Sequence, residues 1–195
     1  MKKNFIILLL IALIPIKAFA LIEVDITRGN LNPLPLAVSP LSIDDTSKKS
    51  FEKILKKENI GSEISSIVEN NLRTSGLFNP LSKDAFLQAP DIANLKPRFE
   101  DWRLIKAQAL VTGKLLVKDG KLKVEFRLWD LAAAKEMTAL AFTTTPSNWR
   151  RVAHIISDKI YERLTGEEGY FDTRIIYVAE SGPKNQRIKK LAIMD

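Results

Sequence analysis

The chain has 195 residues, a formal net charge of +7 at pH 7, one histidine and no cysteine. Without cysteine there can be no disulfide, no lipid attached at a lipobox cysteine, no thiolate metal site and no thiol nucleophile. The length is sufficient for one well-filled hydrophobic core. Three of the basic residues lie in the leader described next, so the rest of the chain is only mildly basic, which does not mark a nucleic-acid-binding protein.

The first twenty residues have the organisation of a cleavable signal peptide. Two lysines at positions 2 and 3 precede an unbroken apolar run at positions 5–14, and Ala18-Phe19-Ala20 has the small-x-small pattern that signal peptidase accepts. An uncleaved membrane anchor is the alternative, but the apolar run is far shorter than the roughly 20 residues that a spanning helix needs. We therefore expect cleavage between Ala20 and Leu21 and a mature protein that works outside the cytoplasm.

The segment that follows the leader alternates apolar and polar residues, as a strand with one face to bury does. It consists of Leu21, Ile22, Glu23, Val24, Asp25, Ile26, Thr27 and Arg28, and Gly29-Asn30 ends it. Burying its inner apolar side chains is worth roughly 5–9 kcal/mol, whereas ordering a terminal residue costs about 1–2 kcal/mol each. Because these quantities nearly cancel over the segment, it can dock on its own domain or leave it to join a partner's sheet. A permanently docked first strand of the fold is the alternative.

The first half of the domain is predicted to contain one short strand and two helices. The strand covers 34–38, and the prolines around it confine it to a sheet edge or a strand start. Residues 39–49 are expected to be a loop, and 51–60 a short helix that buries Phe51, Ile54 and Leu55. A second helix is capped by Ser62 and stopped by Ser75-Gly76, and an extended turn follows it at 78–81.

The second half contains the clearest local signal, a β-hairpin. Residues 110–118 and 121–129 flank Asp119-Gly120, the pair favoured in a two-residue type I′ turn. Its second arm alternates so that one face is covered and the other faces water. A connector at 90–97 and a helix at 98–108 that buries Trp102 and Ile105 precede the hairpin, and a strand at 136–145 follows it.

A long helix then begins at Asn148 or Ser147 and ends at Gly166. Its inward positions are Trp149, Val152, Ile156, Ile160 and Leu164. The fold class is therefore α/β (α+β), with two to three helices packed on a mixed, mostly antiparallel sheet. Two final strands, 173–180 and 186–194, either join that sheet or begin a second, all-β domain, and we favour the second interpretation.

No residue pattern predicts catalysis, a cofactor or a metal. The histidine, His154, has Asp158 one helical turn later, and such a pair could orient a base for a serine, but a polar residue at the flank of a helix is the simpler interpretation. The acidic doublets and the lysine-rich stretches fit solvated turns and helix faces, and the scattered glycines form no phosphate-binding loop. We therefore predict that the protein is not an enzyme and has no small-molecule substrate.

Three stretches resemble the amino-terminal part of the TolB family, periplasmic proteins of the Tol–Pal envelope system. They are 72–81 (LRTSGLFNPL), 149–166 with Trp149 to His154, Ser157-Asp158 and Glu162 to Gly166, and 170–179 (YFDTRIIYVA). The resemblance covers the whole chain. It implies a signal peptide at 1–20, a partner-binding strand at 21–30, an α/β domain at 31–168 that resembles anticodon-binding domains, and the first hairpin of a truncated β-propeller at 169–195.

The resemblance also implies a function without turnover. In the family the mature N-terminal segment binds TolA and the propeller binds Pal, so TolA is the expected partner here and Pal binding is in doubt. The segment 51–60 departs from the family as an insertion. The implied role is a periplasmic adaptor that supports outer-membrane invagination at cell division and envelope integrity. The alternatives are a nucleic-acid or anticodon-type binding module, a small hydrolase that uses His154, and an inactive fragment of a propeller protein.

Overall fold

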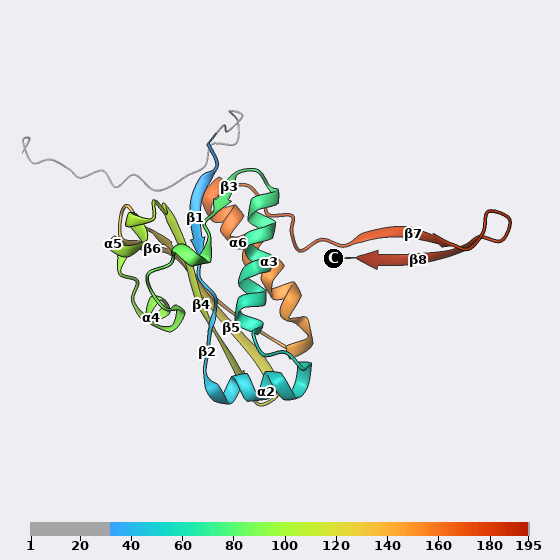
Figure 1. Cartoon of the computed structure of the whole chain (residues 1–195), viewed down its shortest axis with the longest axis horizontal. Helices are drawn as coiled ribbons and strands as arrows, with labels where there is room; N and C mark the ends of the chain where they lie inside the picture. Colours follow the sequence, from blue (N-terminus) through green and yellow to red (C-terminus); the bar gives the residue numbers. More distant parts are fainter. Residues whose placement is uncertain (1–31, 195) are drawn as a thin grey trace, which may run out of the picture.

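A computed structural model of the chain describes residues 32–194. The predicted signal peptide, the cleavage site between Ala20 and Leu21 and the predicted partner-binding segment Leu21–Arg28 lie outside the described residues. Within them, the chain forms one α/β domain followed by a separate β-hairpin (Figure 1).

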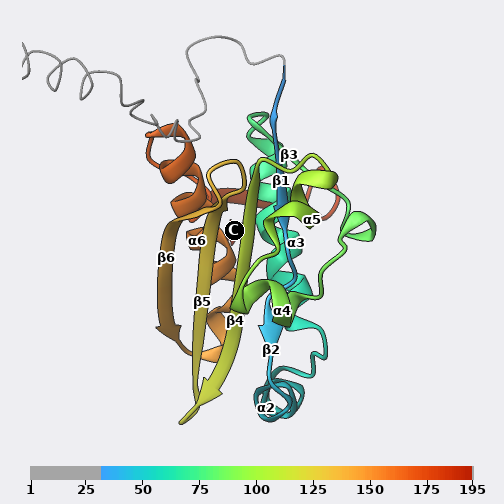
Figure 2. The same ribbon diagram turned by 90° about the vertical axis from the view of Figure 1, so that its left-hand side faces the viewer.

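The domain is built on a mixed six-stranded sheet (Figure 2). Its order is β3-β1-β4-β5-β6, and β2 also pairs with β4. Antiparallel pairing joins the three long strands β4, β5 and β6, whereas the short strands β1, β2 and β3 pair in parallel. The bounds are β1 Leu34–Val38, β2 Ser42–Ile43, β3 Phe78–Pro80, β4 Ala109–Lys118, β5 Lys121–Asp130 and β6 Lys135–Thr144. The predicted fold class, α/β with a mixed and mostly antiparallel sheet, is confirmed. The antiparallel ladders are much longer than the parallel ones.

Of the two places that the prolines predicted for β1, a sheet edge or a strand start, the edge is wrong, because β1 is an inner strand with Pro35 near its start. It lies between β3 and β4. Pro35, its second residue, lacks an N–H, yet its carbonyl still accepts a hydrogen bond from the Gln108 N–H at 2.9 Å. On the other side the Leu34 N–H donates to the Leu77 carbonyl at 2.9 Å. An inner position therefore costs β1 only one donor, and a strand this short tolerates that loss.

The predicted hairpin between β4 and β5 is confirmed. Lys118 pairs with Lys121 across the two-residue turn. Asp119 and Gly120 have φ angles of 52° and 70°, and positive φ at both central positions is what a type I′ turn requires.

Helices α3 (Ile60–Thr74) and α6 (Trp149–Thr165) cover one face of the sheet and enclose the main core. Each helix buries one stripe of apolar side chains, and β5, the second arm of the β4–β5 hairpin, supplies the apolar side chains that face them. The stripes are Ile64, Val68 and Leu72 on α3, Val152, Ile156, Ile160 and Leu164 on α6, and Leu122, Val124, Phe126 and Leu128 on β5. Gly166, with φ of 77°, ends α6 as predicted.

Helix α2 (Asp45–Leu55) closes the end of the domain opposite β3 (Figure 1). It begins earlier than predicted, so the segment expected to be a loop holds β2 and the first turns of this helix. Phe51 is buried as predicted, but Ile54 is 50% exposed and does not face the core. Helix α3 likewise begins before Ser62, with Asn59 at its N-cap position.

The second face of the sheet is partly covered, where the sequence predicted an open one. Helices α4 (Pro90–Leu95) and α5 (Phe99–Leu104) pack there around Trp102, and the 3-10 turn η1 (Lys83–Ala85) precedes them in the chain. The Trp102 indole N–H donates to Gln88 Oε1 at 3.0 Å. A smaller core forms from Ala37, Ala93, Trp102, Ala107, Leu110 and Leu131. The predicted connector at 90–97 is thus largely helical, and the predicted helix at 98–108 is shorter than expected.

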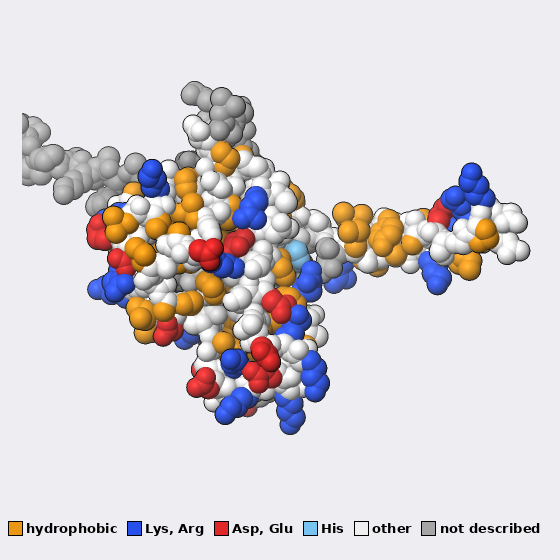
Figure 3. All heavy atoms as spheres, viewed as in Figure 1, with side chains coloured by type: hydrophobic (Ala, Val, Ile, Leu, Met, Phe, Trp, Pro, Cys, Tyr) orange, Lys and Arg blue, Asp and Glu red, His pale blue; other side chains and the backbone are white. Residues whose placement is uncertain are grey.

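The C-terminal strands β7 (Ile175–Ser181) and β8 (Ile188–Met194) form a two-stranded sheet of their own and project from the domain (Figure 1). Large apolar side chains are exposed along the hairpin (Figure 3). They include Ile175, Ile176, Val178, Ile188, Leu191 and Ile193, each more than half exposed. Within residues 32–194, no helix combines the length and the apolar character needed to cross a bilayer.

Candidate interaction site at the junction of domain and hairpin

A groove of about 490 Å³ lies where the domain meets the segment leading to the hairpin. Helix α3 contributes Ile67 and Asn71, helix α6 contributes Arg150 and His154, and the connecting segment and β7 contribute Phe171 and Ile175 among others. The groove therefore combines apolar walls with hydrogen-bonding groups, which suits an extended peptide better than a small ion.

An aromatic cluster forms the base of this junction. The ring of Tyr161 on α6 packs edge-on against Tyr170 at 5.5 Å and Phe171 at 5.8 Å between centroids. On its other side, Tyr161 meets Phe78 of β3 at 6.1 Å. Since Leu34 pairs with Phe78 in the sheet, a continuous chain of contacts joins the start of β1 to the groove wall.

Asp158 holds the connecting segment onto α6. Its two carboxylate oxygens accept hydrogen bonds from the backbone N–H groups of Phe171, at 2.6 Å, and Asp172, at 3.0 Å. The Arg151 side chain pairs with the Asp172 carboxylate at 3.1 Å. Gly169 is required for this close approach, because a Cβ there would lie 2.4 Å from the Asp158 Cα.

His154 belongs to a polar contact between the two main helices. Asn71 Nδ2 lies 2.9 Å from His154 Nδ1 and donates to Ser157 Oγ at 2.9 Å. Because an amide nitrogen can only donate, His154 Nδ1 is the acceptor in this contact. His154 Nε2 is buried and has no hydrogen-bond partner among the described residues.

The hypothetical pair of His154 and Asp158 is not brought together as a catalytic pair. Both carboxylate oxygens of Asp158 accept hydrogen bonds from backbone N–H groups, and the His154 ring contacts Asn71 instead of Asp158. Among residues 32–194, no group of histidine, aspartate and glutamate side chains could hold a metal ion.

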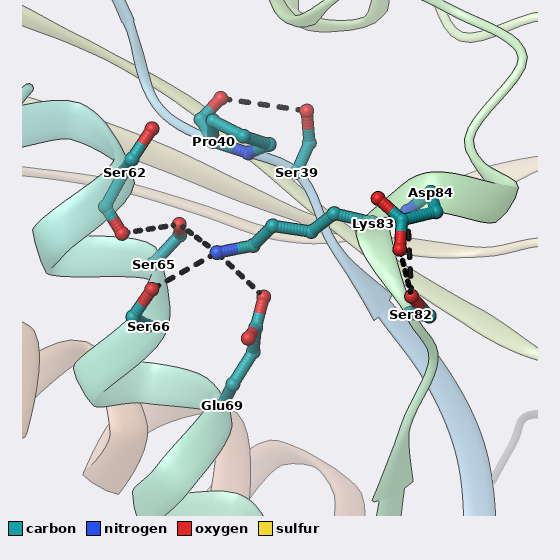
Figure 4. Close-up of polar contacts among 9 residues, drawn as sticks. All are labelled: Ser39, Pro40, Ser62, Ser65, Ser66, Glu69, Ser82, Lys83 and Asp84. Carbon is teal, nitrogen blue, oxygen red and sulfur yellow. Dashed lines mark hydrogen bonds and ion pairs between the residues drawn. The ribbon is translucent and has the colours of Figure 1, made fainter.

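A lysine–serine cluster that the sequence did not single out ties η1 to α3 (Figure 4). Lys83 Nζ lies 3.1 Å from Ser65 Oγ, 3.0 Å from Ser66 Oγ and 3.1 Å from Glu69 Oε1. Serine–lysine pairs occur in hydrolases, where the lysine acts as a base. Here Lys83 Nζ donates to two serine hydroxyls and forms an ion pair with the Glu69 carboxylate, so the cluster is a structural tie between η1 and α3. Burial raises the pKa of the Glu69 carboxyl, and the nearby Lys83 offsets part of that effect.

Comparison with known proteins assigns the family. The model of the TolB amino-terminal domain matches residues 22–137. The chain belongs to the TolB family. This match begins at the predicted partner-binding segment, and the resemblance seen in the three sequence stretches is confirmed. The Tol-Pal system protein TolB of Pelagibacter ubique (strain HTCC1062) is 79% identical over 187 residues. That alignment covers 96% of this chain and 42% of the relative, so the chain spans less than half the length of that TolB.

A solved TolB structure shows the same fold as this chain. TolB from Acinetobacter baumannii superposes with a TM-score of 0.64 at 24% sequence identity, over 84% of this chain and 37% of that one. The LpoB C-terminal domain from Escherichia coli is more distant, with a TM-score of 0.42 and 12% identity over 67% of this chain and 89% of that one.

The junction groove was not predicted. Its residues carry no motif, although Asp158, Phe171 and Asp172 all lie in stretches that resemble the TolB family. The predicted partner-binding residues Leu21–Arg28 lie outside the described residues.

Proposed function

We propose that the chain is a periplasmic adaptor of the Tol–Pal system that captures TolA through its mature N-terminal segment, Leu21–Arg28. Family membership supports the Tol–Pal role, and the signal-peptide pattern of the first twenty residues supports export. In this role the protein performs no reaction and supports outer-membrane invagination at division and the integrity of the envelope.

The anchoring of β1 is the observation that favours the N-terminal segment as the binding element. Strand β1 is hydrogen-bonded on both sides, so the chain preceding Leu34 is attached to a fixed point. From Arg28 to Leu34 the chain can span at most about 20 Å. A segment on so short a tether stays at one end of the domain, where a partner can find it.

The same tether allows the segment an alternative position. The contacts from Leu34 through Phe78 and Tyr161 to Phe171 place the groove wall near the tether's origin. The groove offers Ile67, Phe171 and Ile175 to apolar side chains. We infer that the segment docks on the domain when TolA is absent, and that TolA needs only a few kcal/mol of preference to release it.

We assign no Pal contact to this chain. The resemblance places that contact on the propeller, of which β7 and β8 would be only the first hairpin.

Binding of purified TolA to the full mature chain tests the proposal. The double variant Val24→Asp/Ile26→Asp should lose TolA binding while its melting temperature falls by no more than a few degrees. Leu95→Asp/Leu104→Asp, which places two carboxylates at exposed apolar positions outside the segment, is the matched control and should bind normally. Undiminished TolA binding by the double variant would sink the proposal, and a large loss of stability would show a permanently docked strand instead.

A further inference from the structure

The junction groove has a positively charged rim and no acidic side chain among the described residues that line it. Arg150 lies on this rim, is exposed to solvent and forms no ion pair within residues 32–194. Its guanidinium lies over the Trp149 ring, with Cζ 5.4 Å from the ring centroid. The neighbouring Arg151, by contrast, is already paired with Asp172. Arg150 is therefore positioned by an aromatic ring and available to bind a carboxylate.

Two further polar groups of the groove lack a partner within the described residues. His154 Nε2 is buried and makes no hydrogen bond there, while the other ring nitrogen contacts Asn71. The exposed amide of Asn70, on α3, makes none either. An extended backbone offers a donor and an acceptor at almost every residue, so it could satisfy both groups. The groove thus fits an extended peptide that carries carboxylates.

We propose that the chain's own segment Leu21–Arg28 docks in this groove with the carboxylates of Glu23 and Asp25 on Arg150. This inference rests on the proposed function and adds the contact that holds the segment in its docked position. In an extended segment the two acidic side chains lie on one side and the three inner apolar side chains on the other. The apolar side then enters the groove, and the acidic side lies at the rim, where Arg150 is exposed.

The tether is long enough for this arrangement. Leu34 is the neighbour of Phe78 in the sheet, and Phe78 contacts Tyr161 of α6. From Tyr161 back to Arg150, helix α6 rises about 16 Å. An extended chain from Leu34 to the two carboxylates spans at most about 30–36 Å. The segment therefore reaches Arg150 by running along α6 from the end at which β1 begins (Figure 1).

The contact acts as an internal inhibitor of partner binding. A segment that lies in the groove cannot join a partner's sheet at the same time, so the apparent affinity for TolA is reduced by the fraction of molecules in which the segment is free. An exposed ion pair is weak, so Arg150 biases the docked state without locking it. Removing the charge by Arg150→Ala should raise the apparent affinity for TolA by about two- to fivefold.

Hydrogen exchange in the purified full mature chain, without TolA, measures the docking itself. In the parent chain the amides of residues 22–28 should exchange about tenfold more slowly than in a free peptide of the same sequence. Arg150→Glu should lower this protection at least about threefold, because it replaces attraction by repulsion, and Arg150→Lys should retain most of it. Lys96→Glu, which reverses an exposed charge on the opposite face of the sheet, is the matched control and should match the parent.

Three results would overturn the proposal. They are unprotected amides in the parent chain, protection that Arg150→Glu leaves unchanged, and protection that rises with protein concentration. The last result would assign the groove to a segment of another copy of the chain.

Charge exchange keeps the test independent of the stacking that Arg150→Glu removes from Trp149. Glu23→Lys/Asp25→Lys leaves residues 32–194 unaltered and should lose the protection. Adding Arg150→Glu to it should restore part of the protection, and no restoration would refute the contact. Slow exchange in the β4–β5 ladder reports an intact fold in every variant. Because TolA is absent, these results stand whether or not the segment captures TolA.

Discussion

Asp158 accepts two backbone hydrogen bonds across the junction, and the bond from the Phe171 N–H is 2.6 Å long. This one carboxylate fixes the chain as it leaves the domain, and it seats Phe171 against Tyr161. The wall of the groove therefore depends on a residue that itself belongs to α6 and not to the connecting segment.

Asp158→Asn should loosen the junction. An amide has one accepting oxygen where the carboxylate has two, so one N–H is left facing an N–H₂ group. Hydrogen bonds to charged groups contribute about 1.5–3 kcal/mol, and we expect a loss of unfolding free energy of that order in urea titrations. Glu168→Gln, an exposed acid-to-amide change nearby, is the control. Equal stability of both variants would show that the Asp158 contacts contribute nothing.

Asn71 and His154 should be energetically coupled. Asn71→Ala leaves His154 Nδ1 without its partner, and Nε2 already lacks one. An unsatisfied buried polar group costs about 1–3 kcal/mol. A double-mutant cycle with His154→Ala should therefore give a coupling energy above about 0.5 kcal/mol. Additive effects on unfolding free energy would contradict the contact.

The unfolding free energy of the parent chain should rise relative to that of the Glu69→Gln variant as the pH falls. Its pKa is raised above the ordinary 4.5 by burial. The folded state then holds the proton more tightly than the unfolded state, so this contribution is full below pH 4.5 and is lost as pH rises through the raised pKa. The stability difference between the parent and Glu69→Gln should fall with pH across that interval. Lys83→Met should raise the pKa of Glu69 further, because Lys83 opposes the effect of burial, and so should widen the pH interval over which stability changes. If the effect of Glu69→Gln were independent of pH both with and without Lys83, the raised pKa of Glu69 would be refuted.

Asp44 should have the opposite effect on the pH dependence of stability, because its contribution is lost in acid. Its carboxylate caps α2 by accepting from the Ser47 N–H at 2.9 Å and the Ser47 hydroxyl at 2.7 Å, and the backbone bond from Ser47 is the main reason its pKa is lowered from 3.8. The stabilisation is present above pH 3.8 and is lost as pH falls through the lowered pKa. Asp44→Ala should cost about 1 kcal/mol at neutral pH.

Asp44→Asn separates the cap from the charge. It keeps an accepting oxygen, so it should retain most of the neutral-pH stability while losing the acid dependence. Thermal melts at several pH values give both quantities. An Asn variant as unstable as the Ala variant would mean that the charge, and not the cap geometry, stabilises the helix.

The elements predicted well are those decided by neighbouring residues. Asp119-Gly120 fixes its turn through the φ angles of two residues, and Gly166 stops α6 in the same local way. The position of β1 could not be predicted, because its two parallel partners, β3 and β4, come from distant parts of the chain. Helix α5 was predicted, but as a longer helix than its six residues, whereas α4, also six residues, was predicted to be a connector. Both helices pack around Trp102 together with Ala37 and Leu110 of the sheet.

The candidate site was less predictable than the fold. The spacing of His154 and Asp158 resembles half of a catalytic triad, but Asp158 is used by backbone groups 13 and 14 residues later. Backbone donors leave no signature in side-chain sequence, so this contact could only be seen in the folded chain. The predicted Leu21–Arg28 segment remains a prediction.

The placement of β1 has a mechanical consequence. A partner that pulls on the chain before Leu34 loads a strand held by ladders on both sides, to β3 and to β4. Extracting that strand would require both ladders to break together, and it would open the main core at Leu36 and Val38. A pull on β1 is therefore resisted by two parallel ladders and by the core that its side chains help to form.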